Sequence, residues 1–306
     1  MFYAFFKAES GAIDKAEKEL IFSINKSYDL YHYLLLLPIE IANYAESKIE
    51  AGQAKHRPSP EELNPNTRFI NNPIIKQLAE NENLNKYTGI KKLSWVNNPE
   101  LIKNLYLEII SSDFYAEYMT TKEVGYEGHR VFVIDLYSEF IAQSDLMYQV
   151  LEEMSIYWND DSDFILNMII KTIKKYMPGH NSSKPLMPLY KNEDDAVFAK
   201  NLFRKAIVEF EENKKLIDQF TQNWELERIA FIDMLLISLA ISEINNFSSI
   251  PIKVSFNEYI EIAKYYSTEK SSTYINGMLD KIIALLQKEN KINKIGRGLI
   301  SQSKQS

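Results

Sequence analysis

The residues best suited to chemistry stand between two segments with helical periodicity. They are Tyr265, Tyr266, Lys270, Ser271, Ser272 and Tyr274. Aromatic rings stack on the bases of single-stranded RNA, at about 1–3 kcal/mol per base, while lysine and hydroxyl groups hold phosphates and base edges. An ordinary helix–turn–helix would carry the same residues, since 19 tyrosines are spread along the chain. Composition alone therefore favours a structural role and leaves RNA contact as the alternative.

Motifs typical of catalysis or metal binding are missing from the sequence. It has no G-x-x-x-x-G-K-[ST], G-x-G-x-x-G or H-E-x-x-H motif, and its four histidines lack ligand spacing. We expect His32, in a helix of Tyr and Leu, to be a packed imidazole. The chain has no cysteine, which excludes disulfides and a cysteine nucleophile and fits a cytoplasmic location. We therefore expect no enzymatic activity, no cofactor and no metal.

Two acidic features have simpler interpretations than catalysis. The run NDDSDF at 159–164 lacks the glycine and terminal glutamate of an EF-hand loop. Its aspartates are expected to cap the helix that follows. Asp233 interrupts an apolar helix, where a hydrogen-bonded structural carboxylate is more common than a catalytic acid. Neither feature predicts an active site.

The composition indicates a helical globular protein. Of 306 residues, 45% are hydrophobic and 25% are charged, which is enough apolar material for a core. Nine glycines and ten prolines among many Leu, Ile, Glu and Lys residues favour helices over β-structure. The most apolar runs, 34–42 and 234–241, are shorter than the roughly 20 residues that span a membrane. We therefore expect no association with a membrane.

Charge is distributed unevenly along the chain. The net charge of −7 disfavours nonspecific binding of polyanions by the whole surface. Residues 251–306 hold nine Lys/Arg and five Asp/Glu, a balance of +4, which leaves −11 for residues 1–250. The basic end is the one that contains the Tyr/Lys/Ser group.

Periodicity and breaks divide the chain into helical blocks. Apolar residues at spacings of three and four predict helices over 12–50, with a kink or division at Pro38. Proline and asparagine gather in 56–73, and a second break covers 177–188, so both segments are predicted loops. Residues 74–176, between the two breaks, are predicted to be helical.

The last block has the clearest pattern. Segment 224–244 is apolar nearly all round, which predicts a central buried helix, and Ser255 with Glu258 predicts a capping box at the start of the next helix. Segment 194–220 is predicted to be a helix in which Val197, Leu202, Ile207, Phe210 and Leu216 recur at near-helical spacing, with charged residues elsewhere. The buried stripe predicted for the last helix is Ile275, Leu279, Ile282 and Leu286.

The motifs of residues 192–298 resemble those of the NusB family of transcription antitermination factors. NEDDAVFAKNLFRKAI resembles the family's entry helix, and WELERIAFIDMLLISLAISEI resembles its central helix. IPIKVSFNEYIEIAKYYSTEKSSTYINGMLDKI resembles the signature I-P-x-K-V-x-x-N-E followed by N-G-x-L-D-K. FYAFFKAE resembles the first helix. The resemblance covers about the first 35 and the last 110 residues and leaves the middle unexplained.

The resemblance implies an all-α fold, a NusB-like double helical bundle with an additional inserted helical region. Residues 1–40 would form the first helices and pack with the NusB-like core at 189–298. Residues 41–188 would be the inserted helical region, and 299–306 a flexible tail.

The resemblance also implies a function without catalysis. Members of the family bind boxA RNA of ribosomal RNA operon transcripts together with NusE, a small-subunit ribosomal protein, in an RNA polymerase antitermination complex. The positions carried over as RNA-facing are Tyr3, Asp233, Tyr266, Lys270, Ser271 and Tyr274. Because Lys270 stands where some relatives have an acid, this chain is expected to favour phosphate more. Asn257 and Asn276, also motif positions, are expected to tie helices together.

The sequence departs from the family pattern at two places. Relatives carry a basic arm before the first helix, whereas the first basic residues here are Lys7 and Lys15. We expect a truncated start or an RNA affinity supplied elsewhere. Ser238 stands where the central helix often carries Arg.

The sequence leaves two alternatives to the RNA-binding hypothesis. The first is a helical protein–protein adaptor whose inserted region binds another protein, with weak or no RNA binding. The second is a ribosomal RNA methyltransferase, in which a similar helical domain occurs fused to a catalytic one. The absence of a Gly-rich strand–helix turn and of cysteine excludes the second.

Overall fold

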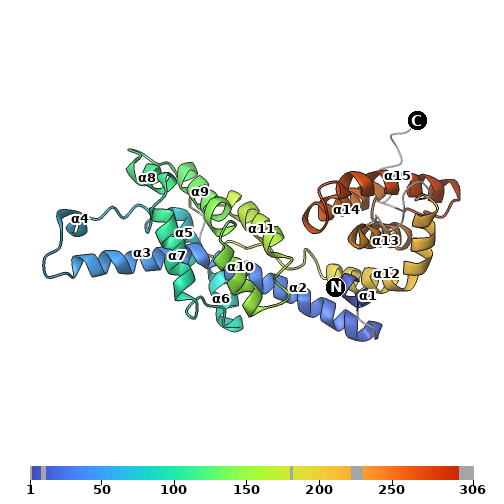
Figure 1. The fold of residues 1–306 in the computed structure, drawn as a ribbon, viewed down its shortest axis with the longest axis horizontal. Coiled ribbons are helices and arrows are strands. Elements are labelled where there is room, and N and C mark those ends of the chain that lie inside the picture. The colour runs from blue at the N-terminus through green and yellow to red at the C-terminus, as the bar shows by residue number, and fades with distance from the viewer. Residues whose placement is uncertain (1, 8–11, 180–181, 222–229, 296–306) are drawn as a thin grey trace. The chain divides into compact units, whose positions relative to one another are not determined.

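The computed structural model describes residues 2–7, 12–179, 182–221 and 230–295. Throughout these ranges the chain forms helices, turns and loops, without a β-strand (Figure 1). The predicted all-α class is confirmed.

The chain divides into two compact units, each with its own hydrophobic core. Unit 1 consists of residues 1–23 and 190–306, and unit 2 of residues 24–189. Helix α2 (Ile13–Leu35) contributes residues to both units. The domain boundaries expected at residues 40, 188 and 298 stay predictions.

Unit 2 is built mostly from short helices that begin at polar caps or at prolines. Asn72, for example, accepts a hydrogen bond from the Ile74 N–H (2.9 Å), and proline in a first turn loses no helical hydrogen bond. Side chains cap α4, α5, α6, α8 and α10, and proline stands in the first turn of α3, α4, α5 and α7. The helices after α2 are α3 (Leu37–Gln53), α4 (Pro60–Leu63), α5 (Pro73–Ala79), α6 (Glu82–Lys91), α7 (Pro99–Ile110), α8 (Asp113–Thr120), α9 (Tyr126–Asp135), the π-helical η1 (Leu136–Ile141), α10 (Asp145–Met154) and α11 (Ser162–Lys174).

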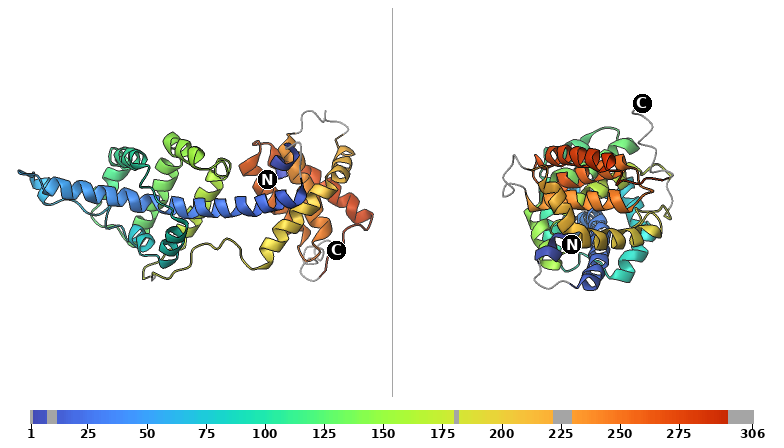
Figure 2. Two further views of the ribbon diagram at one scale, coloured as in Figure 1. Left: turned by 90° about the horizontal axis from the view of Figure 1, so that it is seen from below. Right: turned by 90° about the vertical axis from the view of Figure 1, so that its right-hand side faces the viewer.

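The helix division predicted at Pro38 is confirmed, and it falls at Leu36. α2 ends at Leu35, and α3 begins at Leu37 with Pro38 in its first turn. Proline has no backbone N–H, so the hydrogen-bond ladder of α2 cannot continue through it. Residues 24–35 of α2 and all of α3 nevertheless run in nearly the same direction (Figure 2). The predicted loop 56–73 contains the short helix α4, and 177–188 has no helix in its described residues.

Tyr33 lies at the centre of the unit 2 core. It is fully buried and stacks on Trp95 and on Trp158, with ring centroids 3.9 Å and 5.6 Å away. The Trp95 indole N–H donates to the Tyr33 carbonyl (2.9 Å), and that of Trp158 donates to the Lys26 carbonyl (2.8 Å). Both indoles thus fix the segments that follow α6 and α10 to the backbone of α2.

His32 is packed in unit 2, as predicted. It is 2% exposed, its ring stacks on Tyr87 at 3.8 Å, and Nδ1 lies 2.9 Å from the Tyr28 carbonyl oxygen. Burial lowers the pKa of His32, so the ring is neutral at pH 7. In the acidic run, Asp161 stands at the N-cap of α11, also as predicted, although its side chain makes no capping hydrogen bond and accepts from the Ser27 hydroxyl.

Unit 1 is organised around α13, which is buried on nearly every side. Figure 1 shows α14 and α15 on one side of α13 and α12 on another, and all three pack against it. Residues 224–229 of the predicted central helix lie outside the described residues. The Phe2 and Phe6 rings of α1 pack on Phe210 of α12, at 6.0 Å and 4.2 Å. The helices are α1 (Phe2–Lys7), α12 (Asp194–Asp218), α13 (Phe231–Asn246), α14 (Ile252–Tyr266) and α15 (Ser271–Lys288).

The apolar face predicted for α12 is confirmed in part: Phe210 is buried, and Ile207 and Leu216 are half-buried against the core. Val197 is 57% exposed. The buried positions are Phe203, Ala206, Phe210, Asn213 and Ile217. The sequence pattern does not reveal this stripe, because Asn213 is polar. Inside the core, its Nδ2 donates to the Ser238 carbonyl (3.2 Å) and to Ser242 Oγ (2.9 Å).

The predicted capping box at Ser255 and Glu258 was wrong. Helix α14 begins at Ile252, after Pro251 holds the backbone extended (φ −62°, ψ 138°). Ser255 is fully buried inside the helix, and its N–H already donates to the Pro251 carbonyl (3.2 Å). The buried stripe predicted for α15 is confirmed, since its four members are at most 3% exposed.

Candidate nucleic-acid interface

A short turn joins α14 to α15 and positions the polar group singled out in the sequence. α14 ends at Tyr266, Ser267 is extended (φ −137°, ψ −166°), and α15 begins after Lys270. Inside the turn, the Thr268 N–H donates to Ser271 Oγ (3.2 Å), and the Thr268 and Ser271 hydroxyls lie 2.8 Å apart. The turn is therefore fixed by its own hydroxyl groups.

A buried carboxylate fastens this turn to α13. Asp233, in the first turn of α13, is 5% exposed and accepts hydrogen bonds from Ser267 Oγ (2.5 Å) and Ser271 Oγ (2.9 Å). A helix N-terminus favours negative charge, and the hydroxyl donors stabilise it further. Asp233 is thus the hydrogen-bonded structural carboxylate expected from the sequence.

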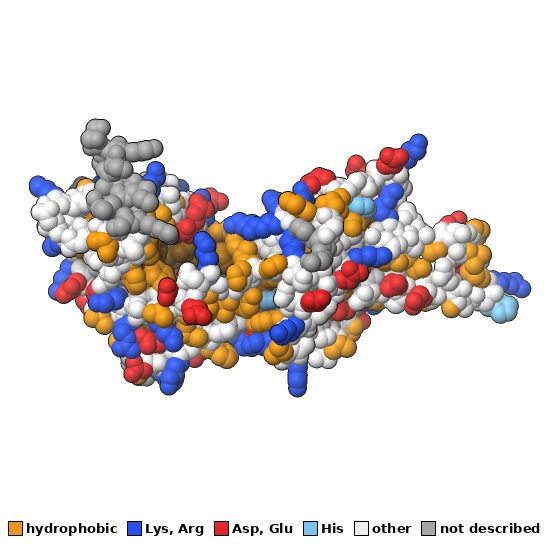
Figure 3. All heavy atoms as spheres, turned by 180° about the vertical axis from the view of Figure 1, so that it is seen from behind, with side chains coloured by type: hydrophobic (Ala, Val, Ile, Leu, Met, Phe, Trp, Pro, Cys, Tyr) orange, Lys and Arg blue, Asp and Glu red, His pale blue; other side chains and the backbone are white. Residues whose placement is uncertain are grey.

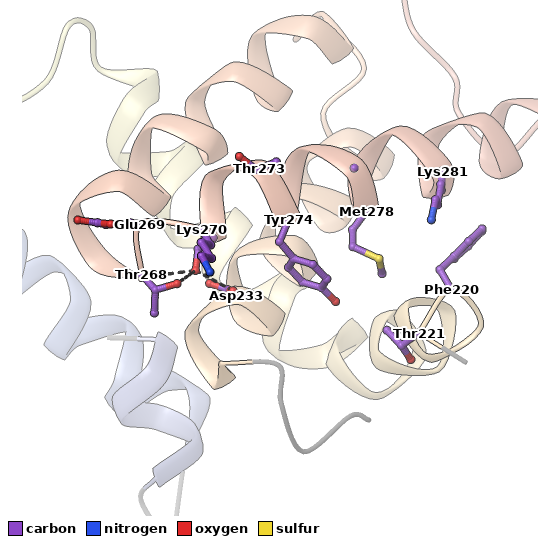
Figure 4. A pocket seen from close by; sticks show the side chains of 12 residues that line it. Phe220, Thr221, Asp233, Thr268, Glu269, Lys270, Thr273, Tyr274, Met278 and Lys281 are labelled. Carbon is purple, nitrogen blue, oxygen red and sulfur yellow. Dashed lines mark hydrogen bonds between the residues drawn. The ribbon is translucent and has the colours of Figure 1, made fainter. Parts of the chain in front are cut away.

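The turn and α15 form one side of an open pocket of about 610 Å³. Figure 4 shows Tyr274, Met278 and Lys281 projecting from α15 on the side of Phe220 and Thr221, which follow α12. The pocket therefore runs from the α14–α15 turn to the end of α12. Its lining residues are Phe220, Thr221, Asp233, Thr268, Glu269, Lys270, Ser271, Thr273, Tyr274, Gly277, Met278 and Lys281.

Helix α15 presents two different faces. Its buried face carries the apolar stripe in the core, whereas its pocket face follows the same three-and-four spacing with other residue types. The pocket face, called here the α15 stripe, consists of Lys270 at the N-cap and of Thr273, Tyr274, Gly277 and Lys281 in the helix. It offers two cations, a hydroxyl and an aromatic ring along one line.

The structure brings four of the six predicted site residues to one pocket. Asp233, Lys270, Ser271 and Tyr274 all line it. Tyr266 is the last residue of α14, half-buried, and does not belong to the lining. Tyr3, on α1, is 43% exposed, and its ring meets that of Phe231 at the start of α13, at 5.5 Å.

Exposure divides the four lining residues into two kinds. Asp233 and Ser271 are buried and hydrogen-bonded to each other, so they support the lining of the pocket from inside the protein. Lys270 is exposed and makes no ion pair with any described residue, and Tyr274 is half-buried. Burial, and secondarily the charge of Asp233, raise the pKa of Tyr274, so its phenol is neutral at pH 7.

The charged side chains are mixed on the side of the molecule drawn in Figure 3, where Lys/Arg and Asp/Glu side chains are interspersed over both units. Within the pocket, Glu269 adds an exposed acid beside Lys270. The lysines of the pocket lining are Lys270 and Lys281.

Two kinds of pocket residue were missed in the sequence. Thr273, Gly277 and Lys281 share the helical spacing of Lys270 and Tyr274, so that spacing is a signal that could have found them. Phe220 and Thr221 come from the end of α12, about 50 positions before Lys270, and only tertiary packing brings them to the pocket.

No group of three or more His, Cys, Asp and Glu residues able to hold a metal occurs among the described residues. Across the same part of the chain, every helix is too short or too polar to cross a membrane.

Unit 1 is thus an all-α unit with an open pocket lined by cations, hydroxyls and an aromatic ring. The NusB family model matches residues 145–284, from α10 to α15. Transcription antitermination protein NusB of Salinibacter ruber is 43% identical over 114 residues, which cover 37% of this chain and 71% of that protein. The chain belongs to the NusB family.

Two further relatives have the same name. NusB of Chloroherpeton thalassium is 42% identical over 106 residues (33% of this chain, 50% of that protein), and NusB of Natranaerobius thermophilus is 47% identical over 72 residues (24% and 52%). The chain thus spans about half the length of these two. No solved structure matches the chain. The relatives support a role in transcription antitermination.

Proposed function

We propose that unit 1 binds single-stranded boxA-like RNA of ribosomal RNA operon transcripts together with NusE. In this role the chain joins the RNA polymerase antitermination complex and acts as a binding protein without catalysis. The observation that carries the proposal is the convergence of Lys270 and Tyr274 on one open pocket, above a turn held by Asp233. A cation and an aromatic ring side by side suit a phosphate and a base of the same strand.

The six predicted residues take different parts in this proposal. Lys270 binds a phosphate, and Tyr274 stacks on a base, because both line the pocket and neither is fully buried. Tyr266 and Tyr3 extend the aromatic surface beyond the pocket. Asp233 and Ser271 hold the turn in place and do not touch the RNA, because their polar atoms are bonded inside the protein.

Titration of fluorescein-labelled boxA RNA, with and without NusE, tests the proposal. The wild type is expected to bind, more weakly as salt rises. Combining Lys270→Ala with Tyr274→Ala is expected to weaken binding by about tenfold or more, since one stacked base alone contributes about 1–3 kcal/mol. The matched control is Lys288→Ala, at the exposed end of the same helix and outside the pocket.

Each outcome of this titration is informative. An unchanged affinity in the double variant, with an unchanged melting temperature, would rule out the pocket as the RNA site. Absence of binding by the wild type under every condition would favour the adaptor hypothesis instead.

Glu269 provides a test in which RNA binding is expected to tighten instead of weaken. Its exposed carboxylate lies next to Lys270 in the lining and repels a phosphate there. Glu269→Gln is expected to tighten RNA binding by about two- to fivefold at low salt, an effect that fades at high salt. A looser complex would contradict the assignment of Lys270 to a phosphate.

A further inference from the structure

The pocket continues beyond the residues that the sequence singled out. Past Tyr274, its lining consists of Phe220 and Thr221 from the end of α12 and Gly277, Met278 and Lys281 from α15. We propose that this α12 end of the pocket is a second nucleotide subsite, in which Phe220 stacks on a base, Gly277 lets the nucleotide approach the helix, and Lys281 binds a phosphate. The inference rests on the proposed function, since it takes the ligand to be the same RNA strand.

Gly277 is the residue that the fold of unit 1 does not explain. It lies in the interior of α15 without a positive φ, and a Cβ at this position would meet nothing within 4 Å. Glycine destabilises a helix interior relative to alanine. Neither backbone conformation nor packing therefore requires it. Because Gly277 has no side chain, the helix backbone is uncovered on the pocket side, where a ligand can come close.

Phe220 supplies the apolar wall of the subsite. It packs partly against the unit 1 core, yet it also lines the pocket, opposite Met278 in Figure 4. Stacking on an aromatic ring tolerates any base, because every base has a π-face. The subsite is thus expected to bind a nucleotide with little sequence preference.

Lys281 supplies the charge. It is exposed and forms no ion pair within the described part of the chain. Lys270 stands eleven residues earlier on the same stripe, so the backbones of the two lysines lie about 16 Å apart along the helix axis. This separation suits two phosphates of an extended strand better than one phosphate shared by both lysines. Thr273, Tyr274 and Gly277 lie between them.

The experiment compares three single variants with the wild type in titrations of fluorescein-labelled boxA RNA in the presence of NusE. Phe220→Leu keeps an apolar side chain but removes the ring, and it is expected to weaken binding about tenfold. Lys281→Gln is expected to reduce the slope of log K against log salt by about 0.7, the value for one phosphate of a single strand. Lys288→Gln, on the same helix outside the pocket, is the control.

Gly277→Ala separates the subsite from a purely structural role. The added methyl group meets no protein atom and favours the helix, so the melting temperature is expected to rise. RNA binding is expected to weaken about three- to tenfold at the same time. If Gly277 had a purely structural role, Gly277→Ala would change the melting temperature and the RNA affinity in the same direction.

The outcomes distinguish this inference from the proposed function. Wild-type affinity in Phe220→Leu and Gly277→Ala, with a loss in the Lys270 and Tyr274 double variant, overturns the second subsite alone. Failure of the wild type to bind RNA overturns both proposals. Loss of NusE binding in the three variants, measured without RNA, would assign this end of the pocket to a protein partner and also overturn the subsite.

Discussion

Unit 1 and unit 2 each bury an aspartate in a helix and stabilise it differently. In unit 2, Asp29 is 3% exposed and lies near two lysines, with Lys26 Nζ at 3.2 Å and Lys91 Nζ at 3.7 Å, while the Tyr87 hydroxyl donates to it at 2.7 Å. In unit 1, the carboxylate of Asp233 accepts from two serine hydroxyls and has no lysine or arginine partner among the described residues.

The difference shows where each unit uses its cations. In unit 2, Lys26 and Lys91 contribute to the fold by neutralising Asp29. In unit 1, hydroxyl groups and the start of α13 stabilise Asp233, so Lys270, a neighbour on the same turn, remains available at the pocket. Because neutral donors hold the buried carboxylate, the neighbouring Lys270 forms no ion pair with any described residue and faces the pocket.

Asp233→Ala should have the largest effect on stability. It removes two hydrogen bonds to a charged group and leaves buried hydroxyls behind, at a cost of about 3 kcal/mol in the free energy of unfolding. Urea denaturation measures this loss, and hydrogen exchange should show it in α13, α14 and α15. A loss below about 1 kcal/mol would mean that the turn does not depend on the carboxylate.

Asp29→Ala should cost less, about 2 kcal/mol, because the lysines that it would leave unpaired are partly exposed and can be solvated. Lys26 and Lys91 are 35% and 40% exposed. This loss should shrink as salt rises, since ion pairs are screened, whereas that of Asp233→Ala should stay constant. An equal salt response in the two variants would remove the contrast between the units.

Tyr87→Phe should cost about 1 to 1.5 kcal/mol, because it removes one hydrogen bond to Asp29 and keeps the ring that stacks on His32. Tyr148→Phe is the matched control, since its hydroxyl donates to the carboxylate of Asp163 at an exposed site. Urea denaturation should place the control close to the wild type.

A fall in pH through the range in which histidines titrate should have the smallest effect on stability, and it should affect unit 2 alone. All four histidines fall within residues 24–189, and burial lowers the pKa of His32, an effect that the Tyr28 carbonyl and Asp29 only partly offset. The unfolded chain therefore binds more protons than the folded one below about pH 6.5, and unit 2 loses stability as the pH falls from there. Burial also lowers the pKa of His129, so His32→Phe should reduce this loss in urea titrations and leave a remainder that belongs to His129. An unchanged pH dependence would exclude His32 as a cause.

The parts of the fold that could be predicted are those in which a local pattern has one interpretation. Pro38 divides a helix whatever surrounds it, and the apolar stripe of α15 admits only one buried face. Ser255 and Glu258, by contrast, have the spacing of a capping box, but Pro251 starts the helix earlier. The buried stripe of α12 was predicted only in part, because Asn213 is buried by hydrogen bonds to α13 that no local pattern contains.

The same distinction applies to the candidate site. Lys270, Ser271 and Tyr274 could be named because they are neighbours in the sequence and resemble a family motif. Phe220 reaches the pocket only because α12 packs on α13, which no short-range spacing predicts. The RNA contacts assigned to these residues stay predictions.

The ring stack of Tyr33 with Trp95 and Trp158 has a spectroscopic consequence. Two of the chain's three tryptophans are locked onto one buried tyrosine in unit 2, so their near-ultraviolet circular dichroism and fluorescence depend on the packing of that core. In a Trp224→Phe background these two indoles are the only tryptophans left. Unit 2 thus carries its own optical probe, with which its unfolding can be followed without a label.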